Sequence, residues 1–280
     1  MPTVLSIQSR VSYGYVGNAA AIFALQLLGC EAWALDTVAF SNHTGHGRWR
    51  GSAVAPETLA ALFEGIAELG VLGGVDAVLS GYLGAPETGP VLLDIVARIK
   101  AANPQALWCC DPVIGDVDTG SYVRPGVAEF FRDRALALAD IATPNCFELQ
   151  YLTGREIAGP ADIVAAAAAL RERGPETVLV TSVECDADRI AMAASGADGT
   201  WLVETPRLPV MLNGCGDVTA ALFLGRRLRG ESLPEALAAT AASLYALIEA
   251  TAARGRYELV LVEARHELVS PRLRLTPRAL

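Results

Sequence analysis

Short apolar runs alternate with longer amphipathic segments over most of the chain. Apolar positions at helical spacing predict helices near 17–28, 56–69, 86–101, 145–153 and 160–173. Compact apolar runs between them, each ending in small or polar residues, predict strands at 3–8, 31–40, 76–84, 106–113, 139–145 and 176–182. Strands that alternate with helices in this way favour an α/β fold, with a mostly parallel sheet covered by helices on both faces.

The pattern changes after the last of these strands. RIAMAAS (189–195) and TWLVETP (200–206), joined by GADG, predict an antiparallel hairpin at an edge of the sheet. Two helices, at 217–229 and 233–252, are predicted for the C-terminal part. Neither a linker nor a repeat interrupts the series, so residues 1–280 are expected to form one domain.

Composition narrows the class of protein. The chain has 280 residues, 52% of them hydrophobic, which is enough for a large core. Its net charge of −9 and the lack of a Lys/Arg cluster argue against a nucleic-acid partner. We find no signal-like N-terminus and no apolar run of 18 residues, so neither export nor a membrane span is expected. Six cysteines without CxxC spacing indicate a reduced, cytoplasmic protein.

Polar residues repeatedly follow the predicted strands. Ligands of open α/β sheets bind at the carboxyl ends of the strands, so these positions are candidates for a site. Taken singly, each is equally compatible with a turn or a cap. The candidates are Ser9, residues 41–44, Tyr82, Asp111, residues 143–148 and Thr181.

The stretch NGCGDV (213–218) combines two glycines with an acid at the start of a predicted helix. Backbone N–H groups of Gly214, Cys215 and Gly216 would form an anion site there, because a helix N-terminus leaves its first donors unpaired. Asp217 would then accept the proton of an attacking hydroxyl during phosphoryl transfer. The alternative is that Asp217 merely caps the helix.

A second candidate is ATPNCFE (142–148), in which Asn145 and Glu148 stand three residues apart. Both would face one side of a starting helix and hold Mg²⁺, mostly through water. The same spacing is that of a capping box, and the two interpretations are compatible. Asp111, at the end of a neighbouring strand, is a candidate for Mg²⁺ or for the phosphates of ATP.

The stretch SNHTGHG (41–47) carries two of the three histidines and predicts a mobile flap. Its spacing does not suit zinc, and a histidine beside hydroxyls there suits a small aromatic ligand; the alternative is a solvated loop. The nucleotide motifs GxxxxGK[ST] and GxGxxG after an N-terminal strand are absent, which argues against a P-loop and a dinucleotide fold.

These motifs, in this order, resemble the ribokinase superfamily and, within it, the pyridoxal kinases. The resemblance runs from about Thr3 to Val262, and GxGD alone marks only the superfamily. The stretches that carry it are IQSRVSYGYVGNAAA (7–21), FSNHTGHG (40–47), LSGYLG (79–84), CDPVIGD (110–116), PNxxE (144–148) and GxGD (214–217).

The resemblance implies a three-layer α/β/α sandwich that forms a homodimer and phosphorylates the 5′-hydroxyl of pyridoxal with MgATP. A monovalent cation such as K⁺ is compatible with it. Asp217 would be the base, and Gly214, Cys215 and Gly216 the anion hole. The residues implied for pyridoxal are Ser9, His43, Thr44, Gly45 and Tyr82. Those implied for ATP are Asp111, Thr143, Glu148, Thr181, Thr205, Pro206, Arg207 and Leu208, with Asp111, Asn145 and Glu148 serving the metal.

The chain departs from the family pattern in one place that bears on function. Thr181 stands where many relatives have a lysine at the end of a strand, so one positive charge is missing from the ATP side. Two alternatives stay open: a hydroxymethylpyrimidine kinase of the same fold, and a protein that binds vitamin B6 without turnover. A sugar kinase is disfavoured, because no room for a lid exists between Gln8 and Asp36.

Overall fold

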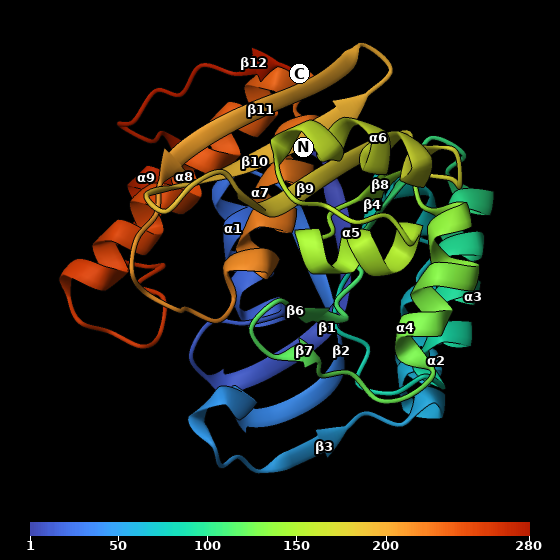
Figure 1. Cartoon of the computed structure of the whole chain (residues 1–280). Coiled ribbons are helices and arrows are strands. Elements are labelled where there is room, and N and C mark those ends of the chain that lie inside the picture. Colours follow the sequence, from blue (N-terminus) through green and yellow to red (C-terminus); the bar gives the residue numbers. More distant parts are fainter.

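A computed structural model describes all 280 residues and shows a sheet between two layers of helices (Figure 1). The strands of this sheet are β1 (Thr3–Tyr13), β2 (Glu31–Asn42), β3 (Gly51–Ala53), β4 (Ala77–Ser80), β5 (Leu107–Cys110), β8 (Ile141–Ala142), β9 (Thr177–Glu184), β10 (Arg189–Gly196), β11 (Gly199–Pro206) and β12 (Arg278–Ala279). Two further strands, β6 (Gly115–Asp116) and β7 (Gly120–Ser121), form a separate small hairpin.

The sheet is mostly parallel, as predicted. Its order is β12-β11-β10-β9-β8-β5-β4-β1-β2-β3. All pairs from β2 across to β9 are parallel, whereas β3, β10, β11 and β12 pair antiparallel at the two edges. The hairpin of β10 and β11 is therefore confirmed. It extends the parallel sheet through β9 and is closed by β12.

Two hydrophobic cores fill the space between the sheet and the helices. The helices are α1 (Asn18–Leu27), α2 (Pro56–Glu68), α3 (Thr88–Ala102), α4 (Val127–Phe130), α5 (Cys146–Thr153), α6 (Pro160–Arg171), α7 (Cys215–Leu228), α8 (Leu233–Ala253) and α9 (Arg265–Val269). One core contains 37 buried residues, with Trp108 and Phe63 among its largest fully buried side chains, and lies against α2 to α6. The other contains 32 and lies against α1, α7 and α8. The predicted three-layer sandwich is confirmed.

Strand ends are where the prediction fails. β1 was expected to stop near residue 8 but continues to Tyr13, after a register shift against β2 between Gln8 and Arg10. Ser9 therefore lies at an irregularity inside the strand and not at its end. β9 similarly continues past Thr181 to Glu184, and Ser182 is the one non-glycine residue with positive φ, 56°. Apolar side chains mark the buried part of a strand, while backbone pairing goes on into solvent.

Helix α8 contradicts the prediction that the chain has no apolar run of 18 residues. By length and composition alone its 21 residues are sufficient to cross a membrane, although no such apolar run was identified in the sequence. Half of the apolar window is buried inside the fold, where α8 packs on α7, β10 and β11. Leu237 and Leu247 are fully buried there. A core helix shows this same pattern.

Candidate active site

The start of α7 holds the proposed base. Gly214 is the N-cap residue, with a φ of 87° that favours glycine, and Asp217 occupies the third position of the helix. The helix begins at Cys215 with Gly214 as its N-cap, two residues earlier than predicted, so the interpretation of Asp217 as the helix cap is wrong. No backbone carbonyl accepts from the N–H groups of Gly214, Cys215 or Gly216. The predicted anion loop thus presents free donors.

Burial changes the acidity of the Asp217 carboxyl. It raises the pKa from 3.8 to about 6, while the backbone N–H of Gly17 favours the charged form and opposes this rise. Burial, together with Asp217, also raises the pKa of the Cys215 thiol to about 12, so the thiol stays neutral. A carboxylate with a pKa just below neutrality is well suited to accept a proton near pH 7.

Asp111 lies directly after β5 and is only 6% exposed. Its Oδ1 accepts a hydrogen bond of 3.0 Å from the hydroxyl of Thr143, which follows β8. The two residues meet because β5 and β8 are parallel neighbours. Burial raises the pKa of Asp111 well above its usual range, with further rises from Glu148 and Asp217. The three acids therefore converge at one edge of the sheet.

Asn145 and Glu148 form the predicted capping box at the start of α5. The Asn145 Oδ1 accepts from the N–H of Glu148 and the Glu148 Oε2 accepts from the N–H of Asn145, both at 2.9 Å. The Glu148 Oε1 accepts from the N–H of Ile114 at 2.8 Å, and the Asn145 Nδ2 donates to the Gly115 carbonyl. Burial nevertheless raises the Glu148 pKa to about 7. Capping is confirmed; metal binding by this pair stays a prediction.

The carboxylates of Asp111 and Glu148 suit a metal ion that keeps most of its water ligands. No group of three or more His, Cys, Asp or Glu side chains is arranged to hold an ion by itself. Asp111 and Glu148 are both buried, Glu148 raises the pKa of Asp111, and neither forms an ion pair with Lys or Arg. A divalent cation would relieve that repulsion, and Mg²⁺ usually keeps several waters and binds through one or two carboxylates.

The flap after β2 contains the predicted ligands of the aromatic substrate. His43 caps the short 3₁₀ helix Thr44–His46, and its Nδ1 accepts from the N–H of Gly45 at 3.1 Å. Burial lowers the pKa of His43, so its ring is neutral. Tyr82 follows β4, and its carbonyl accepts from the Thr37 hydroxyl at 2.6 Å. Burial raises the pKa of the Tyr82 phenol, which is therefore neutral as well.

Ser9 and Asp217 approach each other through Gly17. A Cβ on Gly17 would lie 2.3 Å from the Ser9 Oγ and 2.0 Å from the Ser9 carbonyl oxygen. Gly17 also has a φ of 53°, so a side chain is excluded there on two grounds. The same glycine turns its N–H toward Asp217. The structure therefore brings the predicted substrate side and the predicted base together, despite the wrong strand end.

Of the residues predicted to bind ATP, only some lie near the three acids. The N–H of Thr181 donates to the Pro144 carbonyl at 3.0 Å, which places it beside the α5 cap. Thr205 and Pro206 instead pair with β10 at the open end of the hairpin. The Arg207 guanidinium forms an ion pair with Glu184, and Leu208 is half-buried. No hydrogen bond or ion pair joins 205–208 to the three acids.

Three residues near the site escaped the sequence analysis. Tyr257 and Glu258 lie after α8, outside every motif, yet they contact both the flap and the loop before α7. Tyr122, after β7, is the third omission: burial raises the pKa of its phenol, and Glu148, Asp111, Asp116 and Asp217 add to the rise. Tyr122 lies in the polar stretch that follows Asp111 in the sequence, where spacing alone assigned no residue a role.

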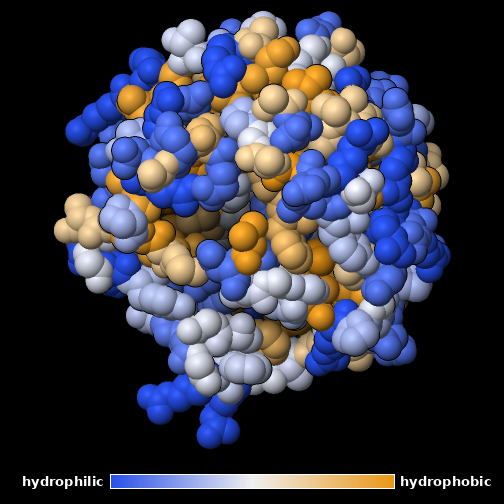
Figure 2. Space-filling model, viewed as in Figure 1, coloured by the Kyte–Doolittle hydropathy of each residue, from blue (hydrophilic) through white to orange (hydrophobic).

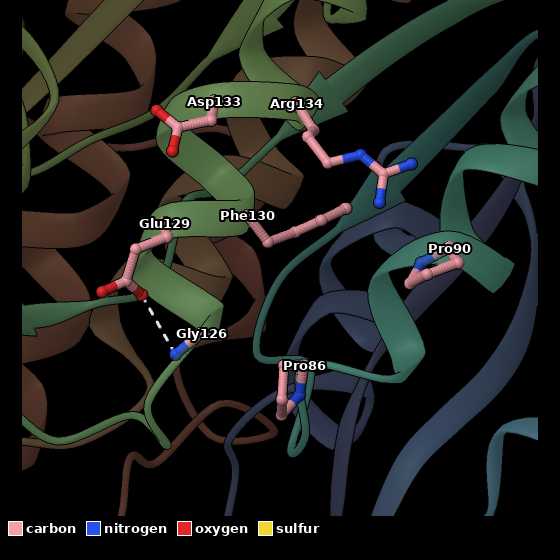
Figure 3. Close-up of a pocket in the computed structure, with 7 residues that line it drawn as sticks. All are labelled: Pro86, Pro90, Gly126, Glu129, Phe130, Asp133 and Arg134. Atoms are coloured by element: carbon pink, nitrogen blue, oxygen red, sulfur yellow. Dashed lines mark hydrogen bonds between the residues drawn. The ribbon is translucent and has the colours of Figure 1, made fainter.

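The surface supports this location. In the view of Figure 1 the space-filling surface is hollowed beside the loop that leads into α7 (Figure 2). A separate pocket of 260 Å³ lies between α3 and α4 (Figure 3) and contains none of the predicted site residues. Its lining residues are Pro86, Pro90, Gly126, Glu129, Phe130, Asp133 and Arg134. The Glu129 carboxylate there accepts from the Gly126 N–H, as part of the α4 cap.

Comparison with known proteins agrees with this geometry. The family model described as phosphomethylpyrimidine kinase matches residues 17–261. The pyridoxal kinase PdxY of Rubrobacter xylanophilus is 52% identical over 279 residues, covering 98% of this chain and 96% of the relative. The chain belongs to the pyridoxal kinases of this family. The PdxY of Granulibacter bethesdensis is 50% identical, with 96% of each chain covered.

A solved structure extends the agreement to the fold. The pyridoxal kinase of Leishmania donovani, in complex with ADP and pyridoxamine, superposes with a TM-score of 0.92. It is 31% identical, and the match covers 99% of this chain and all of the other. The predicted resemblance to pyridoxal kinases is therefore confirmed over nearly the full length.

Proposed function

We propose that this chain transfers the γ-phosphoryl group of ATP to the 5′-hydroxyl of pyridoxal and so forms pyridoxal 5′-phosphate. The observation that carries the proposal is the Asp217 carboxyl at the start of α7, with a pKa of about 6, beside an anion loop with free N–H groups. Membership of the pyridoxal kinases supports the choice of substrate.

Asp217 acts as the general base. Its carboxylate accepts the proton of the substrate hydroxyl as that oxygen attacks the γ-phosphorus, and the bond to the leaving ADP oxygen breaks. The N–H groups of Gly214, Cys215 and Gly216, at the positive end of α7, stabilise the charge that develops on the phosphoryl oxygens. Preorganised donors of this kind need no rearrangement during the reaction.

Asp111 and Glu148 would hold Mg²⁺ through water, and Asn145 would orient Glu148 and contribute to the same shell. The chemistry that such an ion would supply is neutralisation of charge on the ATP phosphates. Thr143 supports this by donating its hydroxyl to Asp111. We include K⁺ as a candidate monovalent cation, because the three acids share no ion pair with a basic side chain.

The substrate ring lies between the flap and the end of the sheet. The Ser9 hydroxyl, close to Gly17, bonds the pyridine nitrogen, while Thr44 and Gly45 cover the ring. The neutral rings of His43 and Tyr82 pack on it. Because Gly17 contacts Ser9 and turns its N–H toward Asp217, this arrangement holds the 5′-hydroxyl on the side of the base.

ATP lies across the ends of β8 and β9. Thr181 and Thr143 face its phosphates, and the segment Thr205 to Leu208 borders its base. We further propose that the chain is one kinase domain, works as a homodimer and acts in the cytoplasm. All six cysteine thiols are unpaired, which suits a reducing compartment.

A second candidate is phosphorylation of hydroxymethylpyrimidine, which the description of the matching family model favours. One assay separates the candidates: release of ADP from MgATP, measured with pyridoxal, pyridoxine, pyridoxamine and hydroxymethylpyrimidine in turn. We expect the highest kcat/KM with pyridoxal. A higher value with hydroxymethylpyrimidine would overturn the assignment, and binding of pyridoxal without ADP release would identify a B6-binding protein.

A further inference from the structure

The flap is attached to a loop from the far end of the chain. The Nε2 of His46 lies 2.7 Å from the Oε1 of Glu258, and the two side chains form an ion pair when His46 is protonated. The rings of His46 and Tyr257 meet edge-on, with centroids 4.7 Å apart. A Cβ on Gly45 would lie 2.7 Å from the Tyr257 hydroxyl, so the flap backbone also rests on this loop.

The loop itself is firmly held. Glu258 is only 8% exposed, and its Oε2 accepts from the backbone N–H of Tyr15 at 3.2 Å. A Cβ on Gly14 would lie 1.9 Å from the same oxygen, so the carboxylate is packed against the turn between β1 and α1. A buried carboxylate with fixed partners is a rigid anchor for a surface segment.

The loop also reaches the anion site. The Tyr257 hydroxyl accepts from the Asn213 Nδ2 at 3.0 Å, and Asn213 directly precedes Gly214. One pair of adjacent residues, Tyr257 and Glu258, therefore contacts the flap, the β1–α1 turn and the loop before α7. These three segments contain or adjoin the residues to which we assign pyridoxal and the transferred phosphoryl group.

The rest of the flap has only local support. Residues 44–50 are exposed, and the Asn42 side chain donates to the Arg48 carbonyl at 2.9 Å. The Arg50 N–H donates to the Ser41 Oγ, also at 2.9 Å. Hydrophilic side chains project from the lower edge of the molecule, where the flap lies (Figure 2). The position of the flap over the site thus depends on the contacts of its residues 45 and 46.

We propose that His46, Tyr257 and Glu258 form a clamp that holds the flap closed over the pyridoxal side and aligns it with the anion loop. These are positioning residues: they act through the flap and through Asn213. The identity of the ligand under the flap rests on the proposed function, whereas the clamp itself rests only on the contacts above. Opening the clamp admits the substrate, and closing it fixes the ring relative to Asp217.

Limited trypsin digestion tests the clamp without any turnover. Arg48 and Arg50 are exposed and lie within four residues of His46. Because a protease cuts a folded protein where its backbone opens locally, faster cleavage after either residue reports an open flap. In His46→Phe, which keeps an aromatic ring, and in Glu258→Gln we expect these cuts to appear about three- to thirtyfold faster, as for loss of one charge-assisted contact. The double variant should be no faster than the faster single one.

A matched control comes from the same loop. Glu263 pairs with Arg254 and does not touch the flap, so Glu263→Gln should be cut at the wild-type rate. Wild-type rates in both His46→Phe and Glu258→Gln would overturn the clamp, and so would an equal acceleration in Glu263→Gln. Because His46→Phe lies on an exposed segment, it should keep the wild-type melting temperature, which separates flap opening from unfolding.

Kinetics give a second readout. His46→Phe should raise the KM for pyridoxal about three- to thirtyfold and leave the KM for ATP within twofold, since the flap does not reach the nucleotide side. Equal changes in both constants would contradict the clamp. If the wild type phosphorylates no B6 vitamer, the proposed function fails, while the digestion experiment still decides the clamp.

Discussion

The backbone N–H of Gly17 faces the carboxylate of Asp217, which joins the turn before α1 to the first turn of α7. The two helices pack side by side and both begin after a glycine with positive φ. A Cβ on Gly214 would lie 2.0 Å from the Tyr15 carbonyl oxygen, so the two turns meet backbone to backbone. An acid can occupy this anion site because two helix starts favour its charge, while burial keeps its pKa near 6.

The first prediction concerns this carboxylate. Asp217→Asn keeps the size of the side chain and removes the base, so kcat should fall about 10²- to 10⁴-fold. Binding of pyridoxal, measured by titration without ATP, should stay close to wild type. Asp198→Asn, in the exposed turn of the β10–β11 hairpin, is the matched control and should leave kcat unchanged. A kcat of Asp217→Asn within threefold of wild type would exclude Asp217 as the base.

The same substitution should stabilise the fold at high pH. The pKa of Asp217 is raised to about 6, so between pH 4 and 6 the folded protein keeps a proton that the unfolded chain has lost. Stability from this group is complete below the unfolded pKa and is lost as the pH rises through the folded one. Asparagine carries no such charge. At pH 8 we expect Asp217→Asn to have a higher free energy of unfolding, by at most about 3 kcal/mol.

Urea unfolding at pH 8 and pH 5 measures this difference. The advantage of Asp217→Asn should shrink at pH 5, because the wild-type carboxyl is then mostly protonated in the folded state. Asp198→Asn serves again as the control for the loss of one acidic group. An advantage that is equal at both pH values, or a loss of stability at pH 8, would contradict burial as the cause of the raised pKa.

Removal of the Ser9 hydroxyl should affect one substrate only. Ser9→Ala should raise the KM for pyridoxal about five- to hundredfold, since a buried polar atom of the ligand loses its partner. The KM for ATP should change little. Ser6→Ala removes a buried hydroxyl of the same strand that accepts from the Gln8 side chain, so it should lower stability without a change in KM. Equal rises in both KM values for Ser9→Ala would indicate a disturbed strand.

Gly17 should tolerate no side chain. In Gly17→Ala the new Cβ would meet the Ser9 carbonyl oxygen at 2.0 Å, at a φ of 53°. We expect a loss of about 1–3 kcal/mol in the free energy of unfolding together with a fall in kcat of more than about tenfold. Gly29→Ala is the matched control, because Gly29 has a φ of 79° but nothing within 4 Å of its Cβ position. It should lose stability alone; an equal fall in kcat would show that backbone strain, and not the contact with Ser9, is responsible.

Much of the fold could be predicted from the sequence, because the spacing of apolar residues indicates both which positions are buried and whether a segment is a helix or a strand. Alternation of apolar strands with amphipathic helices predicted the sheet, its parallel pairs and the edge hairpin. The end of β1 was missed because most of its residues after Ser9 are exposed, with Val11 the buried exception, while they still pair with β2. The strand predicted at 139–145 is also shorter in the structure, where β8 has only two residues and pairs with β5 on one side and β9 on the other.

In the site, too, contacts between residues near in sequence were predicted, and contacts between distant residues were not. Asn145 and Glu148 were found because their partnership is local and has a spacing of three residues. His46 and Glu258 are 212 positions apart, and no periodicity marks such a pair. The first contact depends on helix geometry alone, whereas the second exists only after the C-terminal loop has folded back onto the flap.

The last prediction addresses the lysine that the chain lacks. The N–H of Thr181 bonds the Pro144 carbonyl, next to the α5 cap that fixes Glu148, so a cation at this position would lie on the ATP side of the acids. Thr181→Lys should therefore lower the KM for ATP about two- to tenfold, as expected for about 0.5–1.4 kcal/mol of added attraction. Thr181→Met supplies a long side chain without charge and should leave this KM unchanged. The KM for pyridoxal should be the same in both variants, because Ser9 and the flap lie on the other side of Asp217. If methionine lowers the KM for ATP as much as lysine does, packing and not charge is responsible, and a rise with lysine would mean that the side chain points away from the phosphates.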